Sequence, residues 1–193
     1  MNKYSKISEN LIGQKMFQIL GQAKDLERQG KDVIHFEIGD PDFNTPQTVK
    51  DIACNAIQDN HTHYAVSQGL DEFRQRAAEK IERSRGFLPS VEQILVTPGA
   101  NIQIYLALLA VADPGDEIII TDPCFVSYIS IINLCNLVPV RVALREENDF
   151  RLSPNDLKKV ITKKTKLIII NSPNNPTGSV INKDEIKSIY EIA

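Results

Sequence analysis

The chain has 193 residues, 42% of them hydrophobic and 24% charged, and a formal net charge of −3. This composition is typical of a soluble globular protein and excludes fibrous, disordered and disulfide-stapled chains. The slight negative charge offers no basic surface for nucleic acid. The longest apolar run, Ile104–Ala112, is far shorter than the roughly 20 residues that span a bilayer, so neither nucleic acid nor a membrane is an expected partner.

Cysteine usage and the amino terminus bear on the compartment. Cys54, Cys124 and Cys135 are widely spaced and form no CxxC pair, which is typical of reduced thiols. The amino terminus shows no apolar export segment followed by a small-residue cleavage site. These features predict a cytoplasmic location. His61 and His63 have no further ligand cluster beside them, so no metal site is predicted.

Helical and strand-like segments alternate along the chain, which predicts an α/β fold with a largely parallel sheet. Gly30 is expected to end the first helix, and Thr45, Ser153 and Asn182 to cap later ones. The apolar run Lys166–Ile170 is typical of a strand buried on both faces. The expected helices are 14–29, 46–57, 70–85, 101–112, 125–134 and those beginning at 154 and 183; the expected strands are 33–37, 94–96, 117–121, 137–142 and 166–170.

The loop Thr97–Asn101 passes directly into a helix, at the carboxyl end of a predicted strand. Ligands of open α/β sheets gather at such ends. The small residues Gly99 and Ala100 would let an anion approach backbone N–H groups that the helix leaves unpaired. The loop is therefore a candidate phosphate site, but one glycine is a weak signal and local sequence alone favours a simple strand-to-helix turn.

Two further loops leave strand ends. Phe125 follows the strand 117–121 and could stack on a planar ring, although a lone aromatic residue in this position more often fills the core. Asn175 stands before Pro176 in the loop Asn171–Gly178. A residue before proline is held in an extended or turn conformation, which would aim the Asn175 amide in one direction. A structural turn of common composition is the alternative for this loop.

Taken together and in order, these loops are far more specific than any one of them. The chain resembles the amino-terminal half of the fold-type I pyridoxal-phosphate-dependent aminotransferases of class I/II, which are aspartate-aminotransferase-like. The matching stretches are Gly39–Phe43, Tyr64–Gly69, Thr97–Ala100, Pro114–Glu117 and Asn171–Gly178. The resemblance implies a three-layer α/β/α large domain, incomplete here, with pyridoxal 5'-phosphate as the cofactor.

The resemblance also implies a role for each matching residue. Amides at Gly99, Ala100 and Asn101 would hold the cofactor phosphate, although the family often has a hydroxyl or a lysine where Asn101 stands. Phe125 would stack on the pyridine ring, and Asn175 would donate a hydrogen bond to its phenolic oxygen. 

Two more roles are implied outside these loops. Tyr64 would reach the phosphate of a neighbouring subunit, which presupposes a homodimer, and Gly39 would lie beside the substrate carboxylate. By the same resemblance, residues 1–40 would form an N-terminal arm and part of a small lobe. Residues 41–193 would form a partial cofactor-binding large domain, truncated at its C-terminal end.

The implied reaction transfers an amino group between an amino acid and a 2-oxo acid. It requires a Schiff-base lysine, an aspartate at the ring nitrogen and an arginine for the substrate carboxylate. None of the three is matched in this sequence, so no catalytic residue is assigned and the lysine is expected outside the chain. The alternatives are a non-catalytic remnant or binding subunit, and another reaction of the same cofactor, such as that of a C–S lyase or a synthase.

Overall fold

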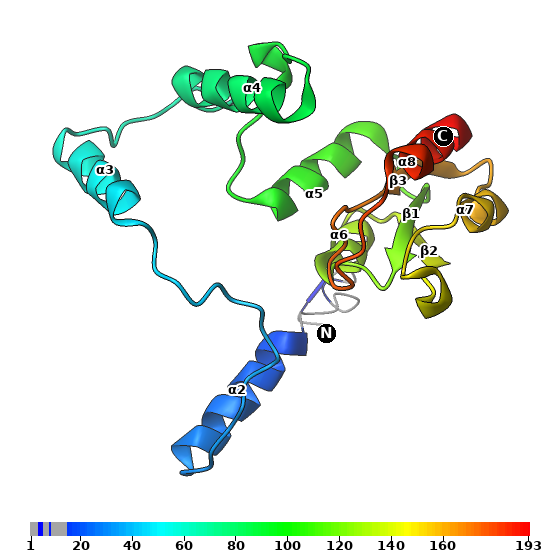
Figure 1. The fold of residues 1–193 in the computed structure, drawn as a ribbon, viewed down its shortest axis with the longest axis horizontal. Helices are drawn as coiled ribbons and strands as arrows, with labels where there is room; N and C mark the ends of the chain where they lie inside the picture. Colours follow the sequence, from blue (N-terminus) through cyan, green and yellow to red (C-terminus); the bar gives the residue numbers. More distant parts are fainter. Residues whose placement is uncertain (1–3, 6–7, 9–14) are drawn as a thin grey trace. The chain divides into compact units, whose positions relative to one another are not determined.

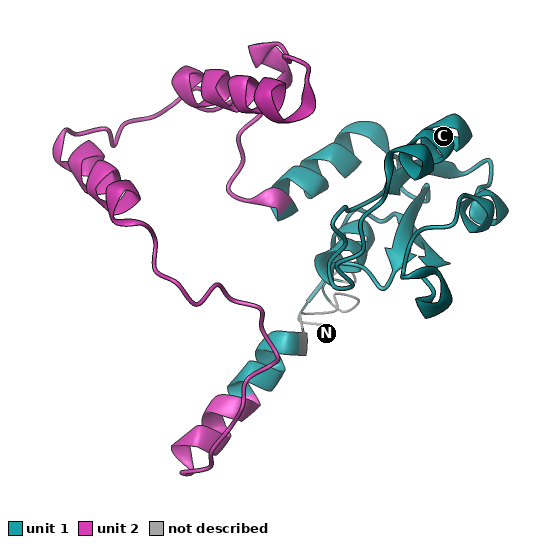
Figure 2. Ribbon diagram, in the orientation of Figure 1, with its two compact units in different colours: residues 1–21, 101–193 teal, residues 22–100 magenta. Residues whose placement is uncertain are grey.

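The computed structural model describes residues 4, 5, 8 and 15–193, and the expectations for the other N-terminal residues lie outside it. The chain separates into two compact units (Figures 1 and 2). Unit 1 comprises residues 1–21 and 101–193, and unit 2 comprises residues 22–100. None of the helices in the described ranges is long and apolar enough to cross a membrane.

Unit 1 is built on a parallel sheet of three strands, β1 (Glu117–Asp122), β2 (Val138–Ala143) and β3 (Thr165–Ile169). The spatial order is β2-β1-β3, and both pairings are parallel. Ile119 of β1 lies opposite Val140 on one side and Ile168 on the other. The structure thus confirms the three strands predicted for this half of the chain, to within one residue at each end.

Helices cover both faces of this sheet and give three layers. The helices α5 (Ala100–Val111) and α6 (Ser127–Leu134) pack on one face, and α7 (Pro154–Val160) and α8 (Lys183–Ile192) on the other. Alternate residues of a strand point to opposite faces, so Ile118 and Ile120 join the first core and Ile119 the second. The predicted three-layer α/β/α class is confirmed.

Capping residues begin two of these helices where the sequence predicts. The Ser153 hydroxyl accepts a hydrogen bond from the Asp156 N–H, and Pro154 follows at the first helical position. Asn182 accepts from the Glu185 N–H, and the Glu185 carboxylate accepts from the Asn182 N–H in return. These partners satisfy N–H groups that the first turn cannot bond internally.

The burial predicted for residues 166–170 is wrong. The segment forms β3, but β3 lies at the edge of the sheet, and its side chains are half-buried apart from the exposed Lys166. The fully buried strand is β1, because it has a neighbour on each side and a helix layer on each face. Apolar content alone does not reveal which of two apolar strands occupies the centre.

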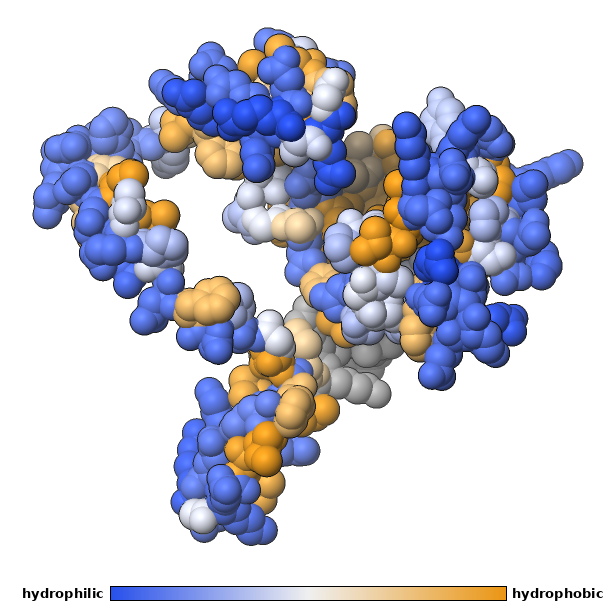
Figure 3. Space-filling model, in the orientation of Figure 1, coloured by the Kyte–Doolittle hydropathy of each residue, from blue (hydrophilic) through white to orange (hydrophobic). Residues whose placement is uncertain are grey.

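Unit 2 is helical. It holds the later part of α2 (Lys15–Arg28), then α3 (Gln47–Gln58), α4 (Asp71–Arg85) and a single turn of 3-10 helix at Val91–Gln93. Gly86 ends α4 in the left-handed conformation, with φ of 79°. Apolar side chains stay exposed on α2 and α3 (Figure 3), and no residue of α3 is buried.

Three local predictions for unit 2 are wrong. Residues 33–37 and 94–96 are extended but form no strand, since a strand requires a hydrogen-bonded neighbour and the described residues supply none beyond the bond from the Val96 N–H to the Gln68 carbonyl. Thr45 does not cap α3. Pro46 is the N-cap, with ψ of 140°, and the helix begins one residue later, at Gln47, without a side-chain cap.

Candidate functional site

The carboxyl ends of β1 and β3 lie at the same end of the sheet, because the two strands are parallel neighbours. The loop after β1 carries Phe125, and the loop after β3 carries Asn175. Two site residues predicted from the sequence thus lie on loops that follow adjacent strands at the same end of the sheet. This is the part of an open α/β sheet where ligands bind.

The Asn175 loop is held by its own hydrogen bonds. Asn174 is buried, its N–H donates to the Ser179 carbonyl at 2.8 Å, and its carbonyl accepts from the Gly178 N–H at 2.7 Å. The Asn174 side-chain amide donates to the Thr177 hydroxyl at 2.9 Å. With its neighbour fixed in this way, the exposed Asn175 side chain is left available to a ligand.

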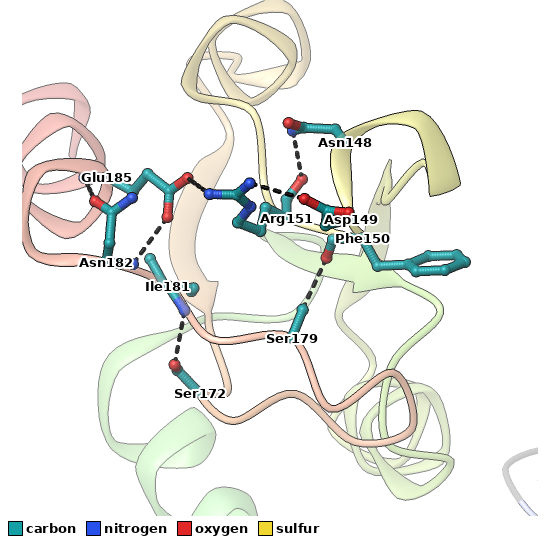
Figure 4. A network of polar contacts seen from close by, with 9 residues as sticks. All are labelled: Asn148, Asp149, Phe150, Arg151, Ser172, Ser179, Ile181, Asn182 and Glu185. Atoms are coloured by element: carbon teal, nitrogen blue, oxygen red, sulfur yellow. Dashed lines mark hydrogen bonds and ion pairs between the residues drawn. The ribbon is translucent and has the colours of Figure 1, made fainter.

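Polar contacts also fasten this loop to its surroundings (Figure 4). The Ser179 hydroxyl donates to the Phe150 carbonyl at 2.9 Å, and the Ile181 N–H donates to the Ser172 hydroxyl at 3.0 Å. Arg151 lies between Asp149 and Glu185, with N–O distances of 2.9 and 3.6 Å. The loop is therefore tied to the turn before α7 and, through Glu185, to the start of α8.

Phe125 is half-buried at the start of the α6 layer. Its ring meets the Tyr128 ring edge to face, with centroids 5.6 Å apart and an interplanar angle of 70°. The ring also packs against the core cluster on the α5 and α6 face. Part of the Phe125 surface therefore serves the core, as the alternative interpretation holds, and part stays accessible at the edge of the sheet.

The start of α5 supplies backbone N–H groups. Ala100 and Asn101 are the first residues of this helix, and both are exposed. The helix packs on the sheet through Ile104 and Leu108 and leads to β1 through a short turn. Gly99, just before the helix, has φ of 93° and no atom within 4 Å of an added Cβ.

Gly39 and Tyr64 belong to unit 2, as do Gly99 and Ala100, whereas Asn101, Phe125 and Asn175 belong to unit 1. Gly39 and Tyr64 are both exposed, and no atom lies within 4 Å of a Cβ added at Gly39. The motif of Tyr64 ends at Gly69, where an added Cβ would meet Val96 at 2.6 Å. The Tyr64 motif and the strand-like stretch that precedes Thr97–Ala100 are therefore in direct contact within this unit.

The charges and burial around Cys124, in the loop after β1, indicate an unreactive thiol. Burial raises the pKa of Cys124, and the Asp122 carboxylate raises it further. Arg141 pairs with Asp122 at 3.3 Å and acts in the opposite direction on the pKa of Cys124. A protonated thiol is a poor nucleophile, so we assign Cys124 no catalytic role.

Comparison with known proteins identifies the family to which the chain belongs. The family model described as aminotransferase class I and II matches residues 31–193. The chain is 40% identical over 173 residues to the probable aspartate/prephenate aminotransferase of Aquifex aeolicus, covering 90% of this chain and 44% of that protein. The chain belongs to the class I and II aminotransferases.

Other relatives of this aminotransferase chain agree. It is 43% identical over 169 residues to the aspartate aminotransferase of Pyrococcus horikoshii, covering 86% of this chain and 43% of that protein. The solved aspartate aminotransferase from Thermus thermophilus with maleate matches with a TM-score of 0.95 at 34% identity, over all of this chain and 50% of that one. The chain thus spans about half the length of the relatives that it matches.

Sequence reasoning missed the residues that hold this aminotransferase loop in place. Asn174 and Thr177 stand within the recognised motif, but the bond between Ser179 and Phe150 and the ion pair of Arg151 with Glu185 join residues that are far apart in the sequence and carry no local signal. The Ser179–Phe150 bond, for instance, joins residues 29 positions apart. Only the folded chain reveals such contacts.

Proposed function

We propose that this chain forms the cofactor-binding part of a pyridoxal-phosphate-dependent aminotransferase, which transfers an amino group between an amino acid and a 2-oxo acid. The observation that carries the proposal is that the loops bearing Phe125 and Asn175 leave two neighbouring parallel strands at the same end of the sheet. The family membership of the chain supports it.

The residues present fit the chemistry of the cofactor. The first turn of α5 offers N–H groups without helical partners, which suit a phosphate dianion. The open space at Gly99 lets that phosphate approach the backbone. A ring face at Phe125 and an amide donor at Asn175 suit a substituted pyridine. When bound, pyridoxal phosphate supplies an electron sink for the carbanion formed at the substrate Cα.

The proposal assigns one task to each residue. Gly99, Ala100 and Asn101 bind the phosphate through backbone N–H groups; Phe125 orients the ring; Asn175 donates to its phenolic oxygen. Gly39 provides backbone next to the substrate carboxylate, and Tyr64 contacts the phosphate bound by the partner copy in a homodimer. The Schiff-base lysine is supplied by residues that this chain does not include.

The same proposal covers organisation and location. Residues 1–40 form an arm with part of a small lobe, and residues 41–193 belong to the large domain. A cytoplasmic location accords with the cysteines, all three of which are unpaired: Cys54, Cys124 and Cys135.

Titration of the chain with pyridoxal phosphate, followed by cofactor absorbance and fluorescence, tests the site. Asn175→Ala removes the amide donor and should weaken binding about fivefold, since one hydrogen bond is worth about 1 kcal/mol. The matched control is Asn155→Ala on α7, an exposed asparagine on the other face of the sheet. Equal weakening in both variants, or no binding by the chain, would contradict the proposed site.

Borohydride reduction in the presence of pyridoxal phosphate tests whether the chain itself contains a Schiff-base lysine. We expect no lysine adduct at a unique position, because no lysine of the sequence matches the family's anchor. A unique adduct would contradict that assignment. For the whole protein, formation of a new amino acid from a 2-oxo acid supports aminotransfer. Elimination or ring formation would instead indicate another reaction of the same cofactor. The absence of any reaction would indicate a non-catalytic binding subunit.

A further inference from the structure

His35 lies between two carboxylates in unit 2. Its Nδ1 is 2.6 Å from Oε1 of Glu37, and its Nε2 is 3.0 Å from Oε1 of Glu27. Glu27 stands in the last turn of α2, whereas His35 and Glu37 belong to the stretch of chain that runs back along that helix (Figure 1). The imidazole therefore bridges the helix and the returning segment.

The geometry determines the protonation state of the ring. An ionised carboxylate only accepts hydrogen bonds, and a neutral imidazole donates from only one of its nitrogens. Both contacts of His35 are therefore satisfied only when the ring is the doubly protonated cation. The Glu37 side chain is 8% exposed, and its hydrogen bond with His35, followed by bonds from backbone N–H groups, lowers the pKa of this carboxyl.

Little else in the described structure holds this segment. Residues 33–37 belong to no sheet. Two of their large apolar side chains, Ile34 and Phe36, are 80% and 91% exposed and contribute little packing. Among the described residues, the ion pair of His35 with Glu27 joins the segment to α2, whereas the pair with Glu37 lies within the segment and holds the imidazole in place.

We infer that His35 is a positioning residue, which as an imidazolium fastens the segment to α2 and so fixes the backbone at Gly39. Gly39 is two residues beyond Glu37, so its Cα stays within about 7 Å of the Glu37 Cα once Glu37 is held. The link to substrate binding rests on the role of Gly39 in the proposed function. The contact of His35 with α2 does not depend on that proposed function.

The fastening depends on pH with a definite sign. The charged groups that face His35 are Glu37 from its own segment and Glu27 from α2; Glu37 first and then Glu27 raise the pKa of His35, and burial opposes them. A raised pKa in the folded state means that the contribution to stability is complete below the ordinary histidine pKa. It is lost as the pH rises through the raised value.

Loss of the proton should release one carboxylate rather than both. The contact with Glu37 is shorter, and that side chain is much less exposed than Glu27, at 8% against 47%. The remaining proton therefore stays on Nδ1, facing Glu37. The contact of Nε2 with Glu27 is lost, which detaches the segment from α2 while the segment keeps its own His35–Glu37 pair.

Nitrogen-15 NMR of the histidine-labelled chain across neutral pH tests this directly. We expect His35 to titrate above the ordinary histidine value and to show the Nδ1–H tautomer on the alkaline side. The amide signal of Gly39 should move with the same midpoint. A His35 midpoint at or below the ordinary value, or the Nε2–H tautomer, would overturn the fastening; a Gly39 amide that does not follow the titration would overturn the positioning role.

Charge-neutral variants sharpen the test. Glu27→Gln and Glu37→Gln should each move the His35 midpoint toward lower pH, whereas Asp32→Asn, which removes a carboxylate of the same segment that is not a His35 partner, should not. A shift with Asp32→Asn equal to that of the other two would contradict the inference. Pyridoxal phosphate binding is measured separately, so its absence would count against the proposed function and leave the histidine result standing.

Discussion

Gly69 is the residue where the backbone conformation matters most in unit 2. Its φ is 101°, a region that L side chains rarely adopt, and an added Cβ would lie 2.6 Å from the Val96 side chain. The neighbouring Val96 N–H donates to the Gln68 carbonyl at 2.9 Å. A single glycine therefore permits the Tyr64 motif to approach the chain that leads into the candidate phosphate loop.

Gly69→Ala should destabilise unit 2 by about 1–3 kcal/mol, because it combines an unfavourable φ with a steric overlap. Urea unfolding measures the loss. The matched control is Gly21→Ala in α2, where nothing lies within 4 Å of the new Cβ, and a gain of about 0.5–1 kcal/mol is expected. A Gly69→Ala chain as stable as the parent would show that the approach to Val96 is not tight.

At the scale of single elements, α8 depends on its capping box. Asn182→Ala removes the acceptor for the Glu185 N–H and should cost about 1 kcal/mol. Lys183→Ala, one position later and outside the box, serves as the control and should change the free energy of unfolding by a few tenths of a kcal/mol at most. Thermal unfolding of the two variants compares them, and equal losses would argue against the cap.

The Asn175 loop is joined to the turn before α7 by the Ser179 side chain. Ser179→Ala deletes the hydroxyl that donates to the Phe150 carbonyl and accepts from Thr177. We expect faster hydrogen exchange at the Gly178 amide, at a cost of about 1 kcal/mol. Ser179→Thr keeps the hydroxyl and should restore slow exchange. Fast exchange in both variants would mean that the hydroxyl does not hold the loop.

At the scale of the whole molecule, the outer edge of β3 carries an apolar groove of about 370 Å³ between β3 and α8. Ile170, Ile186 and Tyr190 in its lining are 40%, 45% and 81% exposed. An edge strand with unpaired backbone groups and adjoining apolar surface favours association. The sequence predicted a strand buried on both faces at this position, so the exposed edge emerges only from the structure.

We expect the chain to self-associate in a concentration-dependent way, and Tyr190→Lys to reduce this by placing a charge in the groove. Glu191→Lys adds the same cation to the same helix outside the groove lining and is the control. Sedimentation velocity measures the effect. A parent chain that stays monomeric and unfolds cooperatively would contradict the prediction.

Local chemistry was sufficient to predict much of unit 1 from sequence. Apolar runs predicted β1, β2 and β3, and the caps Ser153 and Asn182 marked the starts of α7 and α8, because periodicity and capping act within a few residues. The same signals failed at 33–37 and 94–96. A strand depends on a neighbour as well as on its own residues, and local sequence contains no information about that neighbour.

For the site, the sequence by itself determined the ordered set of motifs and hence the family, because glycine, proline and asparagine constrain the backbone at fixed local positions. Only the tertiary structure decided that β1 is central and β3 an edge, that Ser179 bonds to Phe150, and that His35 bridges Glu27 and Glu37. Those outcomes depend on contacts between residues distant in the chain or in separate elements. Packing and charge pairing select such contacts only once the chain has folded.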